Sequence, residues 1–260
     1  MNPLSLSIAL RRRTALETCD LALAFVRRSF RSYFTLWLGT LGVPGVLLYA
    51  LHRVADFGWL TTWLLLAAWI VLVQGFFTLL GGELLFASQA SSKRVARRFF
   101  ASFGRYLVAL VASRLVFALH AVTVILFPRG FAGSTLIAEV VLLEGLKGGA
   151  ALRRGRRLGS TLGRAMLDFG MTLLVGFATA AVLADQVGAA VFTFLLSVGS
   201  PFGSLLEDGG SLYAMLGVLG AVPVVVTARL LAYVDGRAGQ DGWDIQLRFQ
   251  ALRAREETAS

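Results

Sequence analysis

Two ionisable side chains lie inside long apolar stretches of this chain, where they could do chemistry within a membrane. Arg114 is nine residues beyond Arg105, and Glu139 is eight residues before Lys147. At about 1.5 Å of helical rise per residue, both would lie roughly 12 to 14 Å from the same membrane surface. Charged groups at such depth are costly unless they are paired. We therefore predict an ion pair between Arg114 and Glu139 on adjacent antiparallel helices.

Such a pair has a structural and a functional interpretation. It would lock two helices together, or it would form a polar site within the bundle for a lipid headgroup or a proton. Glu83, at the inner end of an earlier apolar run, would extend a site of the second kind. His120 is six residues from Arg114, but a lone histidine is more often a hydrogen-bonded core residue. Both interpretations stay open at this point.

The sequence lacks the motifs of common catalytic and metal sites. It has no G-x-S-x-G, H-E-x-x-H, Walker A or C-x-x-C motif. Two histidines, His52 and His120, are too few for a usual metal site, and a single cysteine, Cys19, excludes an internal disulfide. Ser113 or Ser134 with His120 would be the remaining nucleophile–base combination. We expect no enzymatic activity, cofactor or metal.

The composition identifies the class of protein that must position these groups. Hydrophobic residues make up 57% of the 260 residues and charged residues only 15%, against about 25% charged in a soluble domain. The mean hydropathy is +0.72. Because one span needs roughly 20 apolar residues, the chain holds about six. The predicted fold is an all-α polytopic membrane helical bundle with about six transmembrane helices and amphipathic cytoplasmic helices.

The apolar runs give the expected spans, which are about 33–52, 58–82, 106–127, 131–146, 166–185 and 211–234. Asp185 and Gln186 interrupt the fifth run, so we expect 187–200 to form a short outer helix or a re-entrant segment. The alternative is that 187–200 spans the membrane, which gives seven spans and an outer C-terminus. Pro44 and Pro223 predict bends in the first and last spans.

The distribution of cations favours six spans. Of the 25 lysines and arginines, 22 lie within 11–31, 93–105, 147–164 and 229–255, all on one side of the six-span arrangement. The positive-inside rule then places both termini in the cytoplasm of a bacterial inner membrane. The start of the chain does not match a cleaved signal peptide, because its arginines follow the short apolar run. Trp59 and Trp63 would form an outer aromatic belt.

Three arginine-rich amphipathic segments each lead directly into a span. In the first, residues 13–31, Thr14 with Glu17 fits a capping box that starts a helix. We treat 1–260 as one integral membrane domain of three helix-hairpin units, about 13–90, 91–146 and 147–235, with a cytoplasmic tail, 236–260. An ordinary positive-inside protein would give the same pattern, so the repeat is one of two interpretations. The arginines predicted to contact lipid headgroups or a partner are Arg27, Arg28, Arg97, Arg98, Arg153, Arg157 and Arg164.

The segment from Glu144 to Phe169 carries the clearest of these patterns. Its small residues recur every four positions, at Ala151, Gly155, Gly159 and Gly163. Such a stripe lets another helix approach closely, while the arginines lie on a different face. The alternative is a flexible glycine-rich stretch on a solvated basic loop.

Three further segments resemble an uncharacterised bacterial family of six-span membrane proteins, which includes YciC-like proteins and the membrane domain fused to some glycerophosphodiester phosphodiesterases. ETCDLALAFVRRSF resembles the family's E-I-L-D-x-A-x-x-L-x-R-R-x-F, and EGLKGGAALRRGRRL resembles E-G-x-x-x-x-x-A-L-R-R-S-x-x-L, with Gly155 where the family often has Ser. YVDGRAGQDGWD resembles Y-x-D-x-R-x-x-x-E-G-x-D. The matching positions are Asp20, Glu144, Arg153, Arg154 and Asp235. The resemblance implies an inner-membrane helical bundle and supplies no catalytic residue.

Two functions follow as expectations. The first is a non-enzymatic membrane protein that scaffolds or regulates an envelope assembly through its cytoplasmic helices. The alternative is a transporter or lipid-handling protein with a polar intramembrane site. The pI near 10.9 would also suit a nucleic acid. Because the cations adjoin apolar spans, the bilayer and its anionic headgroups are the expected partners, with other membrane proteins or a second copy besides.

Overall fold

The computed structural model describes residues 13–87, 89–121, 134–162, 164–198 and 201–241, and these contain helices and no strand, which confirms the all-α class. In the names below, η marks a π-helical turn. In chain order the elements are α1 (Ala15–Arg28), α2 (Phe30–Trp37), η2 (Leu38–Gly42), α3 (Val43–Ala55), α4 (Trp59–Leu84), α5 (Ser92–Ala121), α7 (Ile137–Glu139), η3 (Val140–Glu144), α8 (Gly148–Leu162), α9 (Arg164–Ala190), η4 (Val191–Leu195) and α10 (Leu212–Asp241).

Five helical segments are long and apolar enough to cross a membrane. They are Phe30–Ala55, Trp59–Leu84, Ser92–His120, Met166–Leu195 and Leu212–Gln240. Each has 26 to 30 residues, enough for the roughly 30 Å hydrocarbon core even when tilted. The chain is therefore a helical membrane protein.

The fourth predicted span is the exception. Its described part begins at Ser134, and its helical elements α7 and η3 run from Ile137 to Glu144, which rises about 12 Å. Every residue from Leu136 to Leu142 is buried, and this piece packs against α4, α5 and α8. The described residues thus contain five candidate spans, so the predicted number of six is not exact, and residues 122–133 lie outside the described part of the chain.

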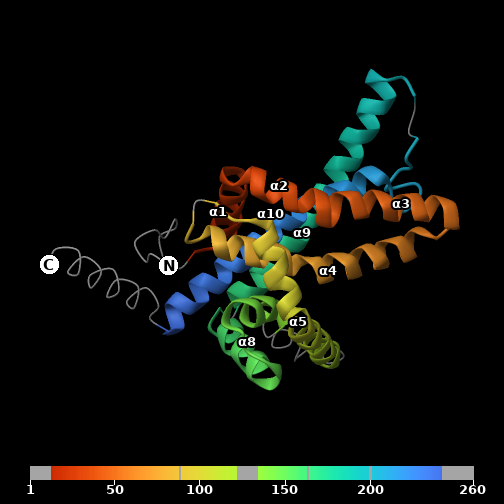
Figure 1. The fold of residues 1–260 in the computed structure, drawn as a ribbon. Coiled ribbons are helices and arrows are strands. Elements are labelled where there is room, and N and C mark those ends of the chain that lie inside the picture. The colour runs from red at the N-terminus through yellow and green to blue at the C-terminus, as the bar shows by residue number, and fades with distance from the viewer. Residues whose placement is uncertain (1–12, 88, 122–133, 163, 199–200, 242–260) are drawn as a thin grey trace.

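Helix α10 is the centre of the bundle. It packs against α1, α2, α3, α4, α8 and α9, and Figure 1 shows it running through the middle of the molecule. Its buried apolar residues include Met215, Leu219, Val222 and Leu230. The helix continues to Asp241, so the first six residues of the predicted tail are helical. Any group that α10 carries inward therefore meets several helices at once.

Pro223 lies within α10, where the sequence predicts a bend, and the carbonyl that it leaves without a backbone donor is bonded by another helix. A proline has no N–H, so the carbonyl four residues earlier, that of Leu219, loses its helical donor. The indole N–H of Trp37 donates to this carbonyl at 2.8 Å. The proline thus joins α10 to α2, because the freed carbonyl is satisfied by another helix.

The same arrangement occurs in the first span. Pro44 cannot donate to the carbonyl of Thr40, which lies in the π-helical turn η2. The indole N–H of Trp69, on α4, donates to that carbonyl at 2.8 Å. Trp69 lies near the middle of its span, and this bond gives it a role that the sequence pattern did not reveal.

Helix α9 passes through Asp185 without interruption and continues as η4 to Leu195. The Asp185 carboxylate is buried because the following loop returns to it: the Ser211 hydroxyl donates to it, and so does the Leu205 backbone N–H at 3.2 Å. Figure 1 shows the end of α9 projecting beyond the other helices. The separate outer helix or re-entrant segment expected for 187–200 is therefore wrong as far as Leu195.

Polar contacts gather the arginine-rich segments at one end of the bundle. Arg13, just before α1, binds Asp235 near the end of α10 at 2.5 Å. Arg98 of α5 binds Glu83 at the end of α4 at 3.1 Å. At the opposite end, the Trp63 indole donates to the Gly209 carbonyl at 2.9 Å. The α1, α5, α8 and α10 cations thus lie at the end away from the paired tryptophans.

Helix α1 begins as predicted. The Thr14 hydroxyl accepts from the Glu17 N–H, and the Glu17 carboxylate accepts from the Thr14 N–H, which completes the capping box. The buried side chains of α1 are Thr18, Ala22 and Phe25. The larger apolar side chains Leu16 and Leu23 are 68% and 57% exposed, so they face away from the bundle.

Candidate functional site

A polar cluster lies inside the bundle around Glu139, whose side chain is completely buried. Arg229 of α10 donates to it from Nη2 at 3.1 Å. The same nitrogen donates to the Thr135 carbonyl, and Nη1 donates to the Gln74 amide oxygen of α4. The inner polar cluster, as we name Gln74, Tyr106, Glu139 and Arg229, therefore connects α4, α7 and α10.

Tyr106 brings α5 into this cluster. Its hydroxyl donates to the Val71 carbonyl at 2.6 Å, and the Gln74 amide donates to the same carbonyl at 3.1 Å. Tyr106 is only 1% exposed. A carbonyl has two lone pairs, so both bonds can form together. Four chain segments that are far apart in sequence thus share one hydrogen-bonded network.

The predicted partner of Glu139 is wrong: the cation that binds it is Arg229, and Arg114 is on the exposed surface of α5. The physical reason is rotation about the helix. Ser113 is 2% exposed and faces the bundle, and successive residues of a helix point about 100° apart, so Arg114 lies at the edge of that face. It interacts electrostatically with Arg229 and Tyr106, but no hydrogen bond or ion pair joins it to Glu139 within the described residues. Sequence position gives depth along a helix but not the direction in which a side chain leaves it.

The sequence did contain a signal for Arg229. The residue lies within the apolar run VVVTARLLAYV, just as Gln74 lies within IVLVQGFF. The distribution of cations alone places Arg229 with the cytoplasmic group, because it is close to the end of its span. A charged residue flanked by apolar residues on both sides is itself a sign of burial with a partner.

Glu83 lies apart from the inner polar cluster. Its carboxylate is 10% exposed and binds Arg98, at the arginine-rich end of the bundle. Within the described residues no bond joins Glu83 to Glu139, Arg229 or Arg114. Of the three residues that the transport interpretation placed around one site, Glu139 lies in the cluster, Arg114 lies beside it, and Glu83 lies apart.

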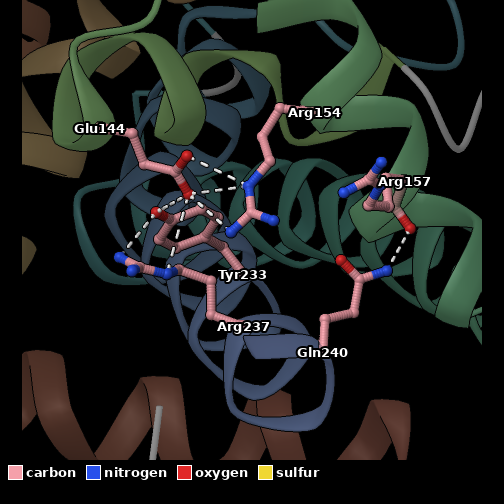
Figure 2. A network of polar contacts seen from close by, with 6 residues as sticks. All are labelled: Glu144, Arg154, Arg157, Tyr233, Arg237 and Gln240. Atoms are coloured by element: carbon pink, nitrogen blue, oxygen red, sulfur yellow. Dashed lines mark hydrogen bonds and ion pairs between the residues drawn. The ribbon is translucent and has the colours of Figure 1, made fainter. Parts of the chain in front are cut away.

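A second network surrounds Glu144, and Figure 2 shows its members converging on one carboxylate. The Arg154 guanidinium of α8 binds Glu144 at 3.1 Å, and the Tyr233 hydroxyl of α10 donates to it at 2.7 Å. Arg237 lies 3.7 Å from the same carboxylate and its guanidinium carbon is 6.0 Å from the centroid of the Tyr233 ring. We call Glu144, Arg154, Tyr233 and Arg237 the elbow network.

The elbow network fixes a sharp change of direction in the chain. Gly145 and Gly148, between η3 and α8, have φ of +71° and +51°, a left-handed conformation that favours glycine. Arg105 donates to the Gly145 carbonyl at 3.3 Å, which adds α5 to the elbow. Glycine residues by themselves restrict the direction of the chain very little. The side-chain contacts of the elbow network therefore determine the direction in which α8 leaves η3.

The small-residue stripe of α8 is confirmed where it can be followed. Ala151, Gly155 and Gly159 are buried, and α8 packs against α5 and α10. Arg153 and Arg156 are exposed on the other face. Gly163 is outside the described residues. The loop alternative is therefore wrong, since 148–162 is a helix with one packed face.

Most of the arginines predicted to contact headgroups are at the surface. Arg27, Arg28, Arg97, Arg153 and Arg157 are exposed, and Arg98 is half-exposed beside Glu83. The side chain of Arg164 is outside the described residues. Of the family-like positions, Glu144 and Arg154 lie in the elbow network, Asp235 binds Arg13, and Asp20 and Arg153 are exposed.

The nucleophile–base combination is not assembled by the bonds that the structure shows. The Ser113 hydroxyl donates to the Leu110 carbonyl, and His120 Nδ1 bonds to the Val116 carbonyl, each within α5. Ser134 lies just before α7. In the described part of the chain no group of three or more His, Cys, Asp or Glu residues could hold a metal ion.

No family model, curated protein or solved structure matches this chain.

Proposed function

We propose that this protein is a non-enzymatic, multi-pass protein of the bacterial inner membrane that scaffolds or regulates an envelope-associated assembly, with both termini in the cytoplasm. The resemblance of three segments to YciC-like membrane proteins is consistent with this proposal. The proposal explains why the buried polar side chains of the bundle bond to one another and so join its helices.

The observation that carries the proposal is the enclosure of Glu139. A transporter or lipid-handling protein needs its polar groups open to a path through the bundle. Glu139 instead has no exposed surface, and Arg229, which binds it, also binds the Thr135 carbonyl just before α7 and the Gln74 amide of α4. A pair engaged in this way holds helices together, and its charges are compensated within the protein.

The surface available to partners is the arginine-rich end. Lys147, just before α8, and Arg153 and Arg156 of α8 are exposed and carry no ion pair within the described residues. Arg27, Arg28 and Arg97 add cations from α1 and α5 at the same end. Clustered cations beside a bilayer attract anionic headgroups and acidic protein segments alike, at roughly 1 kcal/mol per residue near the surface for lipids.

Copurification from membranes in mild detergent tests the proposal. We expect the wild-type chain to retain a specific protein partner in a fixed stoichiometry after cross-linking. Arg153→Gln with Arg156→Gln should reduce that yield several-fold. Arg53→Gln, which removes an exposed cation at the opposite end, is the matched control and should leave the yield unchanged. Equal losses in both variants, or no partner at all, would contradict a scaffold that acts through α8.

A further inference from the structure

The outer face of α1 carries a recess of about 750 Å³. It is lined by Asp20, Leu23, Ala24, Arg27 and Arg28, so a carboxylate and two guanidinium groups border an apolar floor. This face is separate from both the inner polar cluster and the elbow network. All five residues belong to the last turns of α1, which ends directly before the first apolar span.

The three charged groups of this recess are not used within the protein. No hydrogen bond or ion pair joins Asp20, Arg27 or Arg28 to any other side chain in the described residues, and all three are exposed. By contrast, Arg13 on the same segment binds Asp235. Asp20 precedes Arg27 by seven residues and Arg28 by eight, which is roughly 10 to 12 Å along the helix axis. The long arginine side chains can reach back along the helix and shorten the distance between the charges.

The position of the recess suits a molecule that lies half in the membrane. Phe30, at the start of the first span, is 59% exposed, and Leu23 is 57% exposed on the turn before it. Along the chain, Arg27 and Arg28 lie between them, directly before the first candidate span. A ligand bound here would place its polar group between the charges and its acyl chains along the exposed apolar side chains.

From this juxtaposition we propose that the α1 recess binds the headgroup of a zwitterionic phospholipid that carries a primary amine. Its phosphate would accept from Arg27 and Arg28, since guanidinium groups match phosphate oxygens in pairs. Its ammonium group would donate to Asp20. A purely anionic headgroup fits less well, because Asp20 repels it. The inference rests on the proposed function only in that α1 must lie at a membrane surface.

Native mass spectrometry of the full chain in detergent tests this assignment by counting bound lipids. Phosphatidylethanolamine should bind more tightly than phosphatidylglycerol or phosphatidylcholine, whose quaternary ammonium cannot donate a hydrogen bond. Asp20→Asn should weaken phosphatidylethanolamine binding about fivefold and leave phosphatidylglycerol unchanged or tighter. Arg27→Gln with Arg28→Gln should remove the retained lipid. The matched controls are Asp168→Asn and Arg53→Gln, exposed charges that do not line the recess.

Two kinds of result would contradict the assignment of this lipid to the α1 recess. Equal affinity for phosphatidylethanolamine and phosphatidylglycerol, or a preference that survives Asp20→Asn, overturns the role of the amine. Lipid retention that survives the double arginine change overturns the recess as the site. Neither outcome bears on the α8 copurification, so the two proposals fail separately.

Discussion

Arg229 and Glu139 are ninety residues apart in sequence, and their side chains meet at 3.1 Å inside the bundle. The pair joins the central helix α10 to α7, which is too short to cross a membrane by itself. Removing one member would leave the other charge buried without compensation. The pair therefore holds α7 in place, while the elbow network holds the end of η3 at Glu144.

A double-mutant cycle measures this restraint. Arg229→Gln and Glu139→Gln should each lower the free energy of unfolding in detergent by about 3 kcal/mol, because a buried charge loses its partner. The double variant should lose less than the sum, with a coupling of roughly 1 to 3 kcal/mol. Arg114→Gln combined with Glu139→Gln is the control and should be additive. Coupling of Arg114 with Glu139 would contradict the assignment.

The indole–carbonyl bonds at the two prolines give a second prediction. Trp37→Phe should destabilise the protein by about 1 to 2 kcal/mol, because the Leu219 carbonyl loses its only compensating donor. In a Pro223→Ala background, the restored backbone N–H should reduce that loss to below about 0.5 kcal/mol. Thermal unfolding of the four proteins gives both numbers.

The first span supplies the control for this cycle. Trp69→Phe should cost a similar amount and should respond to Pro44→Ala but not to Pro223→Ala. If Trp37→Phe costs the same with and without Pro223, the indole is not acting on the carbonyl that the proline frees.

Asp185 should hold the loop after η4 in place. Asp185→Ala removes the acceptor for Ser211 and Leu205, so the loop should become a site of limited proteolysis and the protein should lose about 1 to 3 kcal/mol. Gln186→Ala changes an exposed neighbour and should alter neither the proteolysis of the loop nor the free energy of unfolding. Similar cleavage of the two variants would show that the loop is held by other contacts.

Cys19 offers a pH-dependent prediction. Burial and the neighbouring Asp20 carboxylate raise the pKa of the Cys19 thiol above its ordinary value. Since the thiolate is the reactive form, maleimide labelling should be slow at about pH 7 and should accelerate up to about pH 10. Asp20→Asn removes the negative charge and lowers the pKa, so labelling at a given pH should become faster. Asp168→Asn should have no effect, and a slower reaction of Asp20→Asn would reverse the predicted sign.

Local patterns in the sequence predicted local structure well. The Thr14–Glu17 capping box and the stripe of Ala151, Gly155 and Gly159 depend on spacing within one helix, and the structure contains both. The apolar runs likewise predicted five of the six spans. These features could be found because they need no knowledge of which helices are neighbours.

Contacts between distant segments could not be found in the same way. The choice of Arg114 as the partner of Glu139 used depth alone, and helix rotation placed Ser113 inward in its stead. The elbow network joins Glu144 to Tyr233 and Arg237, which lie about ninety residues away in sequence. Nothing in their spacing shows that α10 passes through the centre of the bundle and brings them together.

Cysteine accessibility tests most directly whether the inner polar cluster is enclosed. In a Cys19→Ser background, Ser113→Cys and Ala138→Cys place thiols inside the bundle, on α5 and α7, at sites that are 2% and 1% exposed. Ala55→Cys, at an exposed site at the end of α3, is the matched control. With a membrane-impermeant maleimide on vesicles of both orientations, the account predicts that Ala55→Cys reacts while Ser113→Cys and Ala138→Cys react only after denaturation. Labelling of either inner site in intact vesicles would show a water-filled path to Glu139 and would contradict the scaffold.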